Sequence, residues 1–151
     1  MSKIKENSGV LVQGHIKIHD PESGAVFVNK RNAIHYENMS IALAESVANQ
    51  GQGFISSMAF GNGGTSVDPT GIITYLTPNS TGTNASLYNQ TFTKIVDDRS
   101  VSNLDPQRNK IETRHVNGTN YTDVVVTCLL DYGEPNGCLL YTSDAADEGF
   151  C

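Results

Sequence analysis

Four histidines are the first candidates for metal chemistry, and their spacing does not favour a metal site. His15 and His19 share one face of a predicted strand, where a rise of about 3.3 Å per residue separates them by about 13 Å. That distance is too long for two ligands of one ion, and no pair shows the His-x-x-x-His spacing of a helical zinc site. We therefore expect His15, His19, His35 and His115 to be surface or hydrogen-bonded side chains.

The carboxylates are the second candidates. The pair Asp97-Asp98 could bind a hard cation, but neighbouring strand residues point to opposite faces, so a single site would need a loop. The segment 68–71 is not a complete calcium loop. Asp123 and Asp131 flank the last predicted strand, and we interpret them as ordinary edge charges.

A glycine-rich turn at 61–65 follows a predicted strand, as a phosphate-binding loop would. It lacks the Gly-Lys-Ser/Thr ending, and no helix is expected after it. No serine stands in a Gly-x-Ser-x-Gly elbow either. We therefore expect no catalytic residue, no cofactor-binding residue and no metal ligand, and interpret the chain as a non-enzyme.

Composition favours a loop-rich β-protein. Of the 151 residues, 38% are hydrophobic and 17% charged, and 14 are glycine. The net charge of −6 disfavours a nucleic-acid-binding surface, which needs a basic patch. No apolar run reaches the roughly 20 residues of a membrane-spanning helix, and the N-terminus has no secretory h-region. We expect synthesis in the cytoplasm, with neither nucleic acid nor membrane as a partner.

Residues 138–148 read as a translated sequencing adapter, so we expect 138–151 to be a non-native tail. Without that tail, 13 acidic residues face 10 basic ones, a net charge of −3, and Cys128 is the only cysteine left. A disulfide framework is then excluded, and Cys128 is expected to be a small buried thiol. We predict a disordered N-terminus over 1–9 and a single β-rich domain over 10–137 that is incomplete at its C-terminal end.

Alternating apolar residues predict a hairpin of strands 10–19 and 25–29, joined by a turn at 20–24, with a bulge at Gly14. One helix is expected over 39–50. Asn38 or Ser40 would cap its start, and Gly51 would end it. At about 10 residues this helix is too short to be stable alone, so it must pack on the sheet.

The segment 53–60 is apolar on both faces, which predicts a central strand covered on both sides, with the helix over it. Gly61, Gly63 and Gly64 after it allow positive φ and close backbone approach. Further strands are expected at 72–76 and 88–96, and loops at 65–71, 79–86 and 97–109.

Asn117-Gly118 is the preferred sequence of a two-residue type I′ turn, so it predicts a hairpin between 110–115 and 121–130. The second strand is expected to be central, because four apolar side chains share one of its faces: Val124, Val126, Cys128 and Leu130. A turn at 133–137 follows, and the missing next strand would leave an exposed edge. The predicted fold class is mainly β (α+β), an antiparallel β-sheet or sandwich with one short packed helix.

Several segments together resemble virion structural proteins of tailed phages, especially contractile-tailed phages of marine bacteria. The resembling segments cover most of 13–135 and include His15–Val28, Lys30–Ser40, Met58–Thr65, Ile73–Pro78, Leu87–Gln90 and Asp131–Pro135. The resemblance implies a non-catalytic component of the neck, tail or baseplate, located in the virion. It would contact other virion proteins as a homo- or hetero-oligomer.

Two alternatives stay open. A β-sandwich module that binds host-surface glycans would use exposed aromatic side chains, and Tyr75, Tyr88 and Tyr121 are available, although there is no Trp. A virion-associated hydrolase would need a carboxylate pair or metal cluster in a cleft, and the spacing indicates none.

Overall fold

The structure is a computed structural model that describes residues 9–78 and 85–134. These residues are mainly β, with eight strands and one helix, and every strand pair is antiparallel. The predicted fold class of antiparallel strands with one helix is confirmed. The chain divides into two compact units between Ile34 and His35, and each is described on its own.

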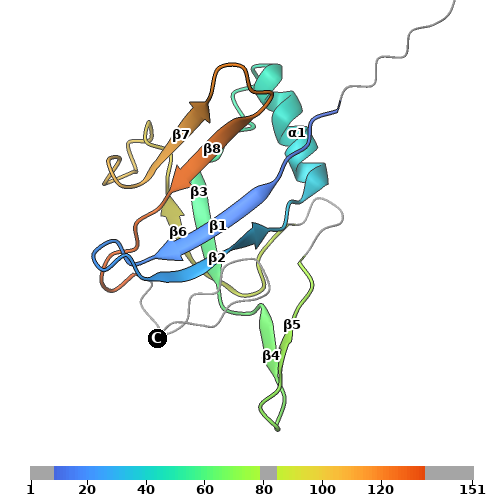
Figure 1. Cartoon of the computed structure of the whole chain (residues 1–151), viewed down its shortest axis with the longest axis vertical. Helices are drawn as coiled ribbons and strands as arrows, with labels where there is room; N and C mark the ends of the chain where they lie inside the picture. Colours follow the sequence, from blue (N-terminus) through green and yellow to red (C-terminus); the bar gives the residue numbers. More distant parts are fainter. Residues whose placement is uncertain (1–8, 79–84, 135–151) are drawn as a thin grey trace, which may run out of the picture. The chain divides into compact units, whose positions relative to one another are not determined.

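The first unit is the hairpin of β1 (Gly14–His19) and β2 (Val26–Asn32) (Figure 1). Its turn is closed by the Gly24 amide, which donates to the Asp20 carbonyl at 2.9 Å. This confirms the predicted hairpin, although its first strand begins at Gly14 and not at residue 10, and its second strand continues to Asn32 and not only to residue 29. The bulge is not at Gly14, however, because the register shifts between Ile18 and His19.

In the second unit, α1 (Tyr36–Val47) starts earlier than predicted. Its N-cap is His35, whose Nδ1 accepts a hydrogen bond from the Asn38 amide at 3.2 Å, so the predicted caps Asn38 and Ser40 are wrong. A ring nitrogen here replaces the side-chain oxygen that caps most helices.

The helix ends at Val47 with Ala48 as its C-cap, and the next residue, Asn49, takes the left-handed conformation with a φ of 54°. Asparagine tolerates that region better than most residues, so the predicted stop at Gly51 comes two residues too late. No residue of α1 is buried, and its more covered side chains, such as Met39 and Ala42, are half-buried. The chain returns close to the helix at Gly53, where a Cβ would lie 2.1 Å from the Ala42 carbonyl oxygen.

β3 (Ser57–Gly61) pairs with β6 (Gln90–Ile95) in a two-stranded sheet. The prediction that 53–60 is the middle of a wider sheet is therefore wrong, since β3 has one strand neighbour. The apolar residues that suggested it, Phe54 and Ile55, lie before the strand and are exposed. Phe60 is 4% exposed and its ring lies 6.2 Å from that of Phe92 on β6.

β4 (Thr65–Val67) and β5 (Ile73–Tyr75) form a hairpin. β5 lies within the strand predicted at 72–76, whereas β4 lies where a loop was predicted over 65–71. Asp68 shapes its turn, because its carboxylate accepts hydrogen bonds from the Thr70 and Ile72 amides at 2.8 and 3.0 Å. Within the second unit the hairpin extends away from β3 and β6 (Figure 1). The alternation of apolar and polar residues does not reveal β4, because a strand of three residues is too short to show a period.

β7 (Lys110–His115) has the predicted bounds and pairs with β8 (Thr122–Thr127). The ladder closes at His115 and Thr122, so six residues connect the strands. Gly118 has a φ of 85° but Asn117 does not have positive φ, which excludes the predicted type I′ turn.

β8 is also not central, because its sheet contains only β7 and β8. Val124 is exposed, and Val126 and Cys128 are half-buried. A turn at 131–134 is present, closed by the Glu134 amide and the Asp131 carbonyl at 3.0 Å. Predictions for 1–8, 79–84 and 135–151, including the adapter-like tail and its two cysteines, lie outside the described residues.

Candidate functional site

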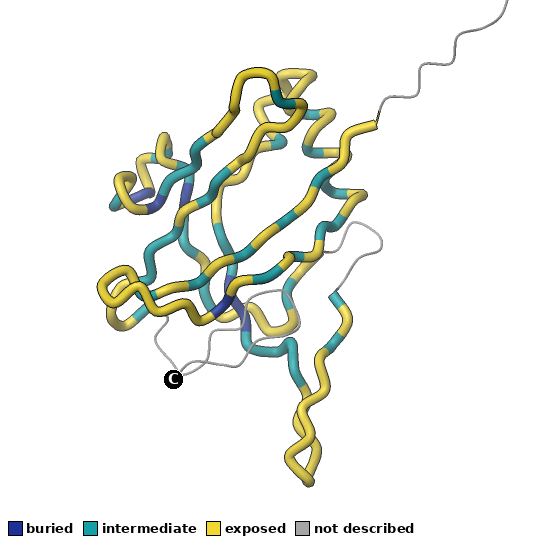
Figure 2. The backbone as a smooth tube through the Cα atoms, in the orientation of Figure 1, coloured by how far each residue is buried: buried dark blue, intermediate teal, exposed yellow. Residues whose placement is uncertain are grey.

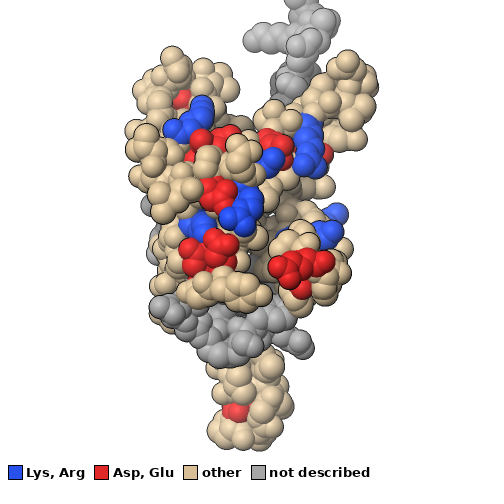
Figure 3. Space-filling model, turned by 90° about the vertical axis from the view of Figure 1, so that its left-hand side faces the viewer, with Lys and Arg blue, Asp and Glu red and all other residues tan. Residues whose placement is uncertain are grey.

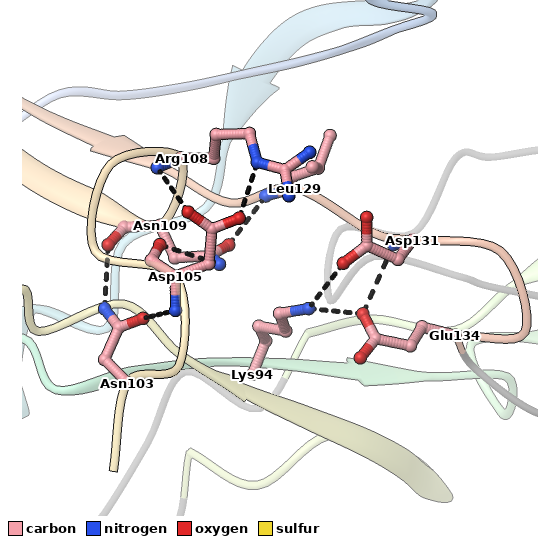
Figure 4. A network of polar contacts seen from close by, with 8 residues as sticks. All are labelled: Lys94, Asn103, Asp105, Arg108, Asn109, Leu129, Asp131 and Glu134. Carbon is pink, nitrogen blue, oxygen red and sulfur yellow. Dashed lines mark hydrogen bonds and ion pairs between the residues drawn. The ribbon is translucent and has the colours of Figure 1, made fainter. Parts of the chain in front are cut away.

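A polar network orders the segment 97–109 between β6 and β7 (Figure 4). Asn103 Nδ2 donates to the backbone carbonyls of Asp97 and Asn109 at 3.1 and 2.8 Å. Asn109 Nδ2 donates to the Asp105 carbonyl at 3.3 Å, and its Oδ1 accepts from the Leu129 amide at 2.8 Å. Because both asparagines are buried, these bonds satisfy groups that water cannot reach.

The loop predicted at 97–109 is thus confirmed as a loop, but it is one with a buried polar centre. Sequence reasoning missed Asn103 and Asn109 as structural residues. Both stand in a polar, turn-rich segment where asparagine is common, so nothing in the residue types separates them from exposed neighbours.

A second cluster joins β6 to the turn at 131–134 (Figure 4). Lys94 Nζ forms ion pairs with the Glu134 carboxylate and with Asp131 Oδ2, the latter at 3.7 Å. Glu134 Oε2 also accepts a hydrogen bond from the Asp131 amide at 3.2 Å. Asp131 was interpreted as an ordinary edge charge, and the structure instead places it in this cluster.

The pKa values of Lys94 and Glu134 are shifted in the directions that favour the charged forms of both side chains. The hydrogen bond from Lys94, with that from the Asp131 amide, lowers the pKa of Glu134. Burial opposes the charge on Lys94, but the hydrogen bond and charge of Glu134 outweigh it and raise the pKa of Lys94. Burial also raises the pKa of the nearby Cys128 thiol, which makes it a poor nucleophile.

The arrangement of Lys94, Asp131 and Glu134 is a structural link. A general acid or base needs a pKa that is shifted toward neutral pH, whereas Lys94 and Glu134 are shifted away from it.

The predicted hydrogen-bonding role of the histidines is confirmed for three of them. His15 Nε2 lies 2.6 Å from Asn29 Oδ1, and His35 caps α1. His115 Nδ1 lies 3.0 Å from both the Tyr121 carbonyl and Thr122 Oγ1. In the described part of the chain, no group of three or more histidine, cysteine or acidic side chains could hold a metal ion.

Asp97 Oδ1 accepts a hydrogen bond from the Arg99 amide at 3.0 Å and also faces the Arg99 side chain, while Asp98 is exposed. The adjacent carboxylates thus do not converge. The Arg99 guanidinium lies 5.8 Å from the centre of the Phe54 ring, a separation typical of a cation–π contact.

The glycine-rich turn after β3 is a close backbone crossing. A Cβ at Gly61 would lie 2.8 Å from the Asn89 carbonyl oxygen, and one at Gly63 would lie 2.8 Å from the Tyr88 carbonyl carbon. The predicted close approach is therefore confirmed for both. The predicted positive φ is wrong for Gly61, Gly63 and Gly64, since none of them has it.

One face of the β4–β5 hairpin is mostly apolar and exposed. Val67 pairs with Ile73 and Thr65 with Tyr75, so these four side chains share a face, while Ser66 and Thr74 lie on the other. We call Val67, Ile73 and Tyr75 the β4–β5 apolar face. They are 62%, 50% and 44% exposed, and the hairpin is exposed along most of its length (Figure 2).

This hairpin is almost free of charge. Its only side chain with a formal charge at neutral pH is Asp68. The surface at the bottom of Figure 3, where this hairpin lies, accordingly shows little charge. Hydrogen bonds, first from the Thr70 hydroxyl and then from the Ile72 amide, lower the pKa of Asp68. The carboxylate is therefore engaged by its own turn.

The three candidate glycan-contacting tyrosines differ in their surroundings. Tyr75 is on the β4–β5 apolar face and Tyr121 is 59% exposed in the β7–β8 connection. Tyr88 donates its hydroxyl to the Thr77 carbonyl at 2.6 Å.

Comparisons with protein-family models, curated proteins and solved structures gave no match to this chain. Among the described residues, no helix is long and apolar enough to span a membrane.

Proposed function

We propose that this chain is a non-catalytic structural component of a tailed phage particle, in the neck, tail or baseplate. It acts through contacts with other virion proteins, as a homo- or hetero-oligomer, after synthesis in the host cytoplasm. The resemblance of segments across 13–135 to such proteins supports this assignment.

The observation that carries the proposal is the β4–β5 apolar face. Antiparallel hairpins in soluble proteins usually cover their apolar side with the rest of the fold and expose their polar side. Here both sides of the hairpin are exposed, the apolar one included, and neither strand carries the lysines or prolines that discourage edge pairing. A subunit that assembles would cover such a surface with a neighbour.

The test is immunolabelling of contractile-tailed particles that carry the gene, viewed by negative-stain electron microscopy. Antibodies against the chain should mark one substructure of the particle at a constant position. Preimmune serum and particles of a phage that lacks the gene are the controls. Absence of label on intact and on partly disassembled particles would overturn the proposal.

A second candidate is a glycan-binding module, favoured by the exposure of Tyr75 and Tyr121, since aromatic rings commonly stack on sugars. A glycan array separates the two. Binding that is lost in Tyr75→Ala and Tyr121→Ala, and kept in Tyr132→Ala, would support this candidate. No binding to any glycan would exclude it.

A further inference from the structure

We propose that the Asn117-Gly118 turn is a site of spontaneous covalent modification, at which the Asn117 side chain is converted to a mixture of aspartate and isoaspartate by water. Asn117 lies in the exposed connection between β7 and β8. The inference does not depend on the function proposed above.

The step needs a free backbone nitrogen next to the side-chain amide. The Gly118 nitrogen attacks Cγ of Asn117, the Cγ–Nδ2 bond breaks, and ammonia leaves with the proton from the Gly118 amide. A five-membered imide results. Water then adds to one of its two carbonyls and opens the ring, giving aspartate or isoaspartate at position 117. No electrons are transferred, and water is the only co-reactant.

The local geometry leaves both reacting groups accessible. The β7–β8 ladder ends at the pair His115 and Thr122, so Asn117 and Gly118 lie beyond it. One backbone hydrogen bond closes the turn, from the Thr119 amide to the Val116 carbonyl at 3.1 Å. Within the described residues, neither the Asn117 side chain nor the Gly118 amide has a hydrogen-bond partner.

Gly118 removes the steric barrier to the attack. A Cβ at this position would meet no atom within 4 Å, so the space on that side of Gly118 is open. Glycine also lets the backbone rotate toward the cyclic geometry more freely than any other residue.

The same dipeptide occurs at Asn62-Gly63, where the surroundings oppose the reaction. The Gly63 amide donates to the Tyr88 carbonyl at 3.2 Å, and Asn62 Oδ1 accepts from Asn89 Nδ2. The backbone of Gly63 also lies close to that of Tyr88, so Gly63 cannot rotate without separating these two segments of the chain. The chain therefore holds an internal control with identical covalent chemistry. A third such pair, at 136–137, lies outside the described residues.

The modification would add one negative charge to a chain of net charge −6. The isoaspartate product would also lengthen the backbone by one carbon. Because this carbon would lie beyond the last ladder pair, we expect the β7–β8 pairing to remain intact.

The test is ageing of the full chain in mildly alkaline buffer made with ¹⁸O-labelled water, followed by peptide mass spectrometry. Label should enter the Asn117 peptide at least roughly tenfold faster than the Asn62 peptide, the ratio that a barrier difference of about 1.4 kcal/mol gives. In denaturing urea the two rates should converge, because the protection of Asn62 is then lost. Equal rates in the folded chain, or an unchanged ratio in urea, would overturn the proposal.

Two variants sharpen the result. Asn117→Gln should abolish labelling at this turn without changing the unfolding midpoint. Asn89→Gly keeps the left-handed backbone at position 89, where φ is 46°, but removes the amide that holds Asn62. It should speed labelling of Asn62 and leave Asn117 unaffected. An unchanged Asn62 rate in this variant would contradict the role given to its hydrogen bonds.

Discussion

At the scale of single residues, two buried asparagines connect separate backbone segments by side-chain hydrogen bonds. Asn103 and Asn109 fasten the segment 97–109 to the chain at Leu129 through neutral hydrogen bonds. A neutral amide can be buried at lower cost than a carboxylate or ammonium group. It also offers both a donor and an acceptor at one position.

We predict that Asn109→Ala destabilises the chain by about 1–3 kcal/mol, because it leaves the Leu129 amide without the acceptor it has in the folded chain. Urea unfolding followed by circular dichroism measures the loss. The exposed Asn120→Ala is the matched control and should change stability by less than about 0.5 kcal/mol. Equal effects of the two variants would contradict the role of Asn109.

We predict that Phe60→Ala costs about 3–5 kcal/mol, since it leaves a cavity beside Phe92. Phe54→Ala removes a ring that is 53% exposed and contacts Arg99, so it should cost about 1 kcal/mol or less. Thermal unfolding of both variants provides the comparison. If Phe60→Ala leaves stability unchanged, Phe60 is not a core residue.

The Lys94–Glu134 pair predicts a pH dependence with a definite sign. The pKa of Glu134 is lowered on folding, so its stabilisation is present above the ordinary carboxyl pKa and is lost as the pH falls through the folded value. Lys94 has a raised pKa, so its contribution is lost only at strongly alkaline pH. Unfolding midpoints of the original chain and of Glu134→Gln should differ at neutral pH and converge in acid. A difference that persists in acid would contradict this assignment.

At the scale of elements, the alternation of apolar and polar residues predicted where most strands lie, but not which strand each of them pairs with. The β7 bounds and the β1–β2 hairpin followed from period-two patterns and turn residues. β4 was missed because three residues are too few for a pattern. The sheets were predicted too wide, because an apolar strand was taken to have neighbours on both sides, and the neighbours come from distant parts of the chain.

We predict that Val67→Lys weakens assembly without weakening the fold. Val67 is exposed, so the added charge opposes only a neighbour that would cover the β4–β5 apolar face. Ser66→Lys places the same charge on the opposite face and is the matched control. Recombinant variants are compared by thermal unfolding and by incorporation into particles. Equal incorporation of the two variants would exclude this face as a contact.

At the scale of the whole molecule, the chain buries few apolar side chains. Among the described residues these are Val28, Phe60 and Val96, whereas many large apolar side chains are exposed. This sparse core agrees with the low hydrophobic fraction of the sequence, 38%. Of the segment 53–60 that was predicted to be covered on both sides, Phe60 is buried whereas Phe54 and Ile55 are exposed, because burial depends on strand pairing that the sequence does not specify. The β4–β5 apolar face was not predicted for the same reason, because it is defined by the pairing of β4 with β5.

A sparse core predicts a shallow response to denaturant. The slope of unfolding free energy against urea should be about 1 kcal/mol/M, the lower end of the roughly 1–3 kcal/mol/M found for small proteins, because the slope follows the surface exposed on unfolding. Equilibrium urea titration by fluorescence and circular dichroism measures it. A slope near the upper end would show a larger buried surface than the described residues contain.

The close approach of Gly61 and Gly63 to the backbone of Tyr88 and Asn89 limits which substitutions the folded chain can tolerate. Every nucleotide change that replaces glycine adds at least one carbon, and at these two positions that carbon would meet backbone within 3 Å. At Gly64 it would meet nothing within 4 Å. Saturation mutagenesis should therefore find that positions 61 and 63 tolerate only glycine and that position 64 tolerates other residues, although the three glycines look alike in the sequence. The backbone of Tyr88 and Asn89, far along the chain, decides which of them can vary.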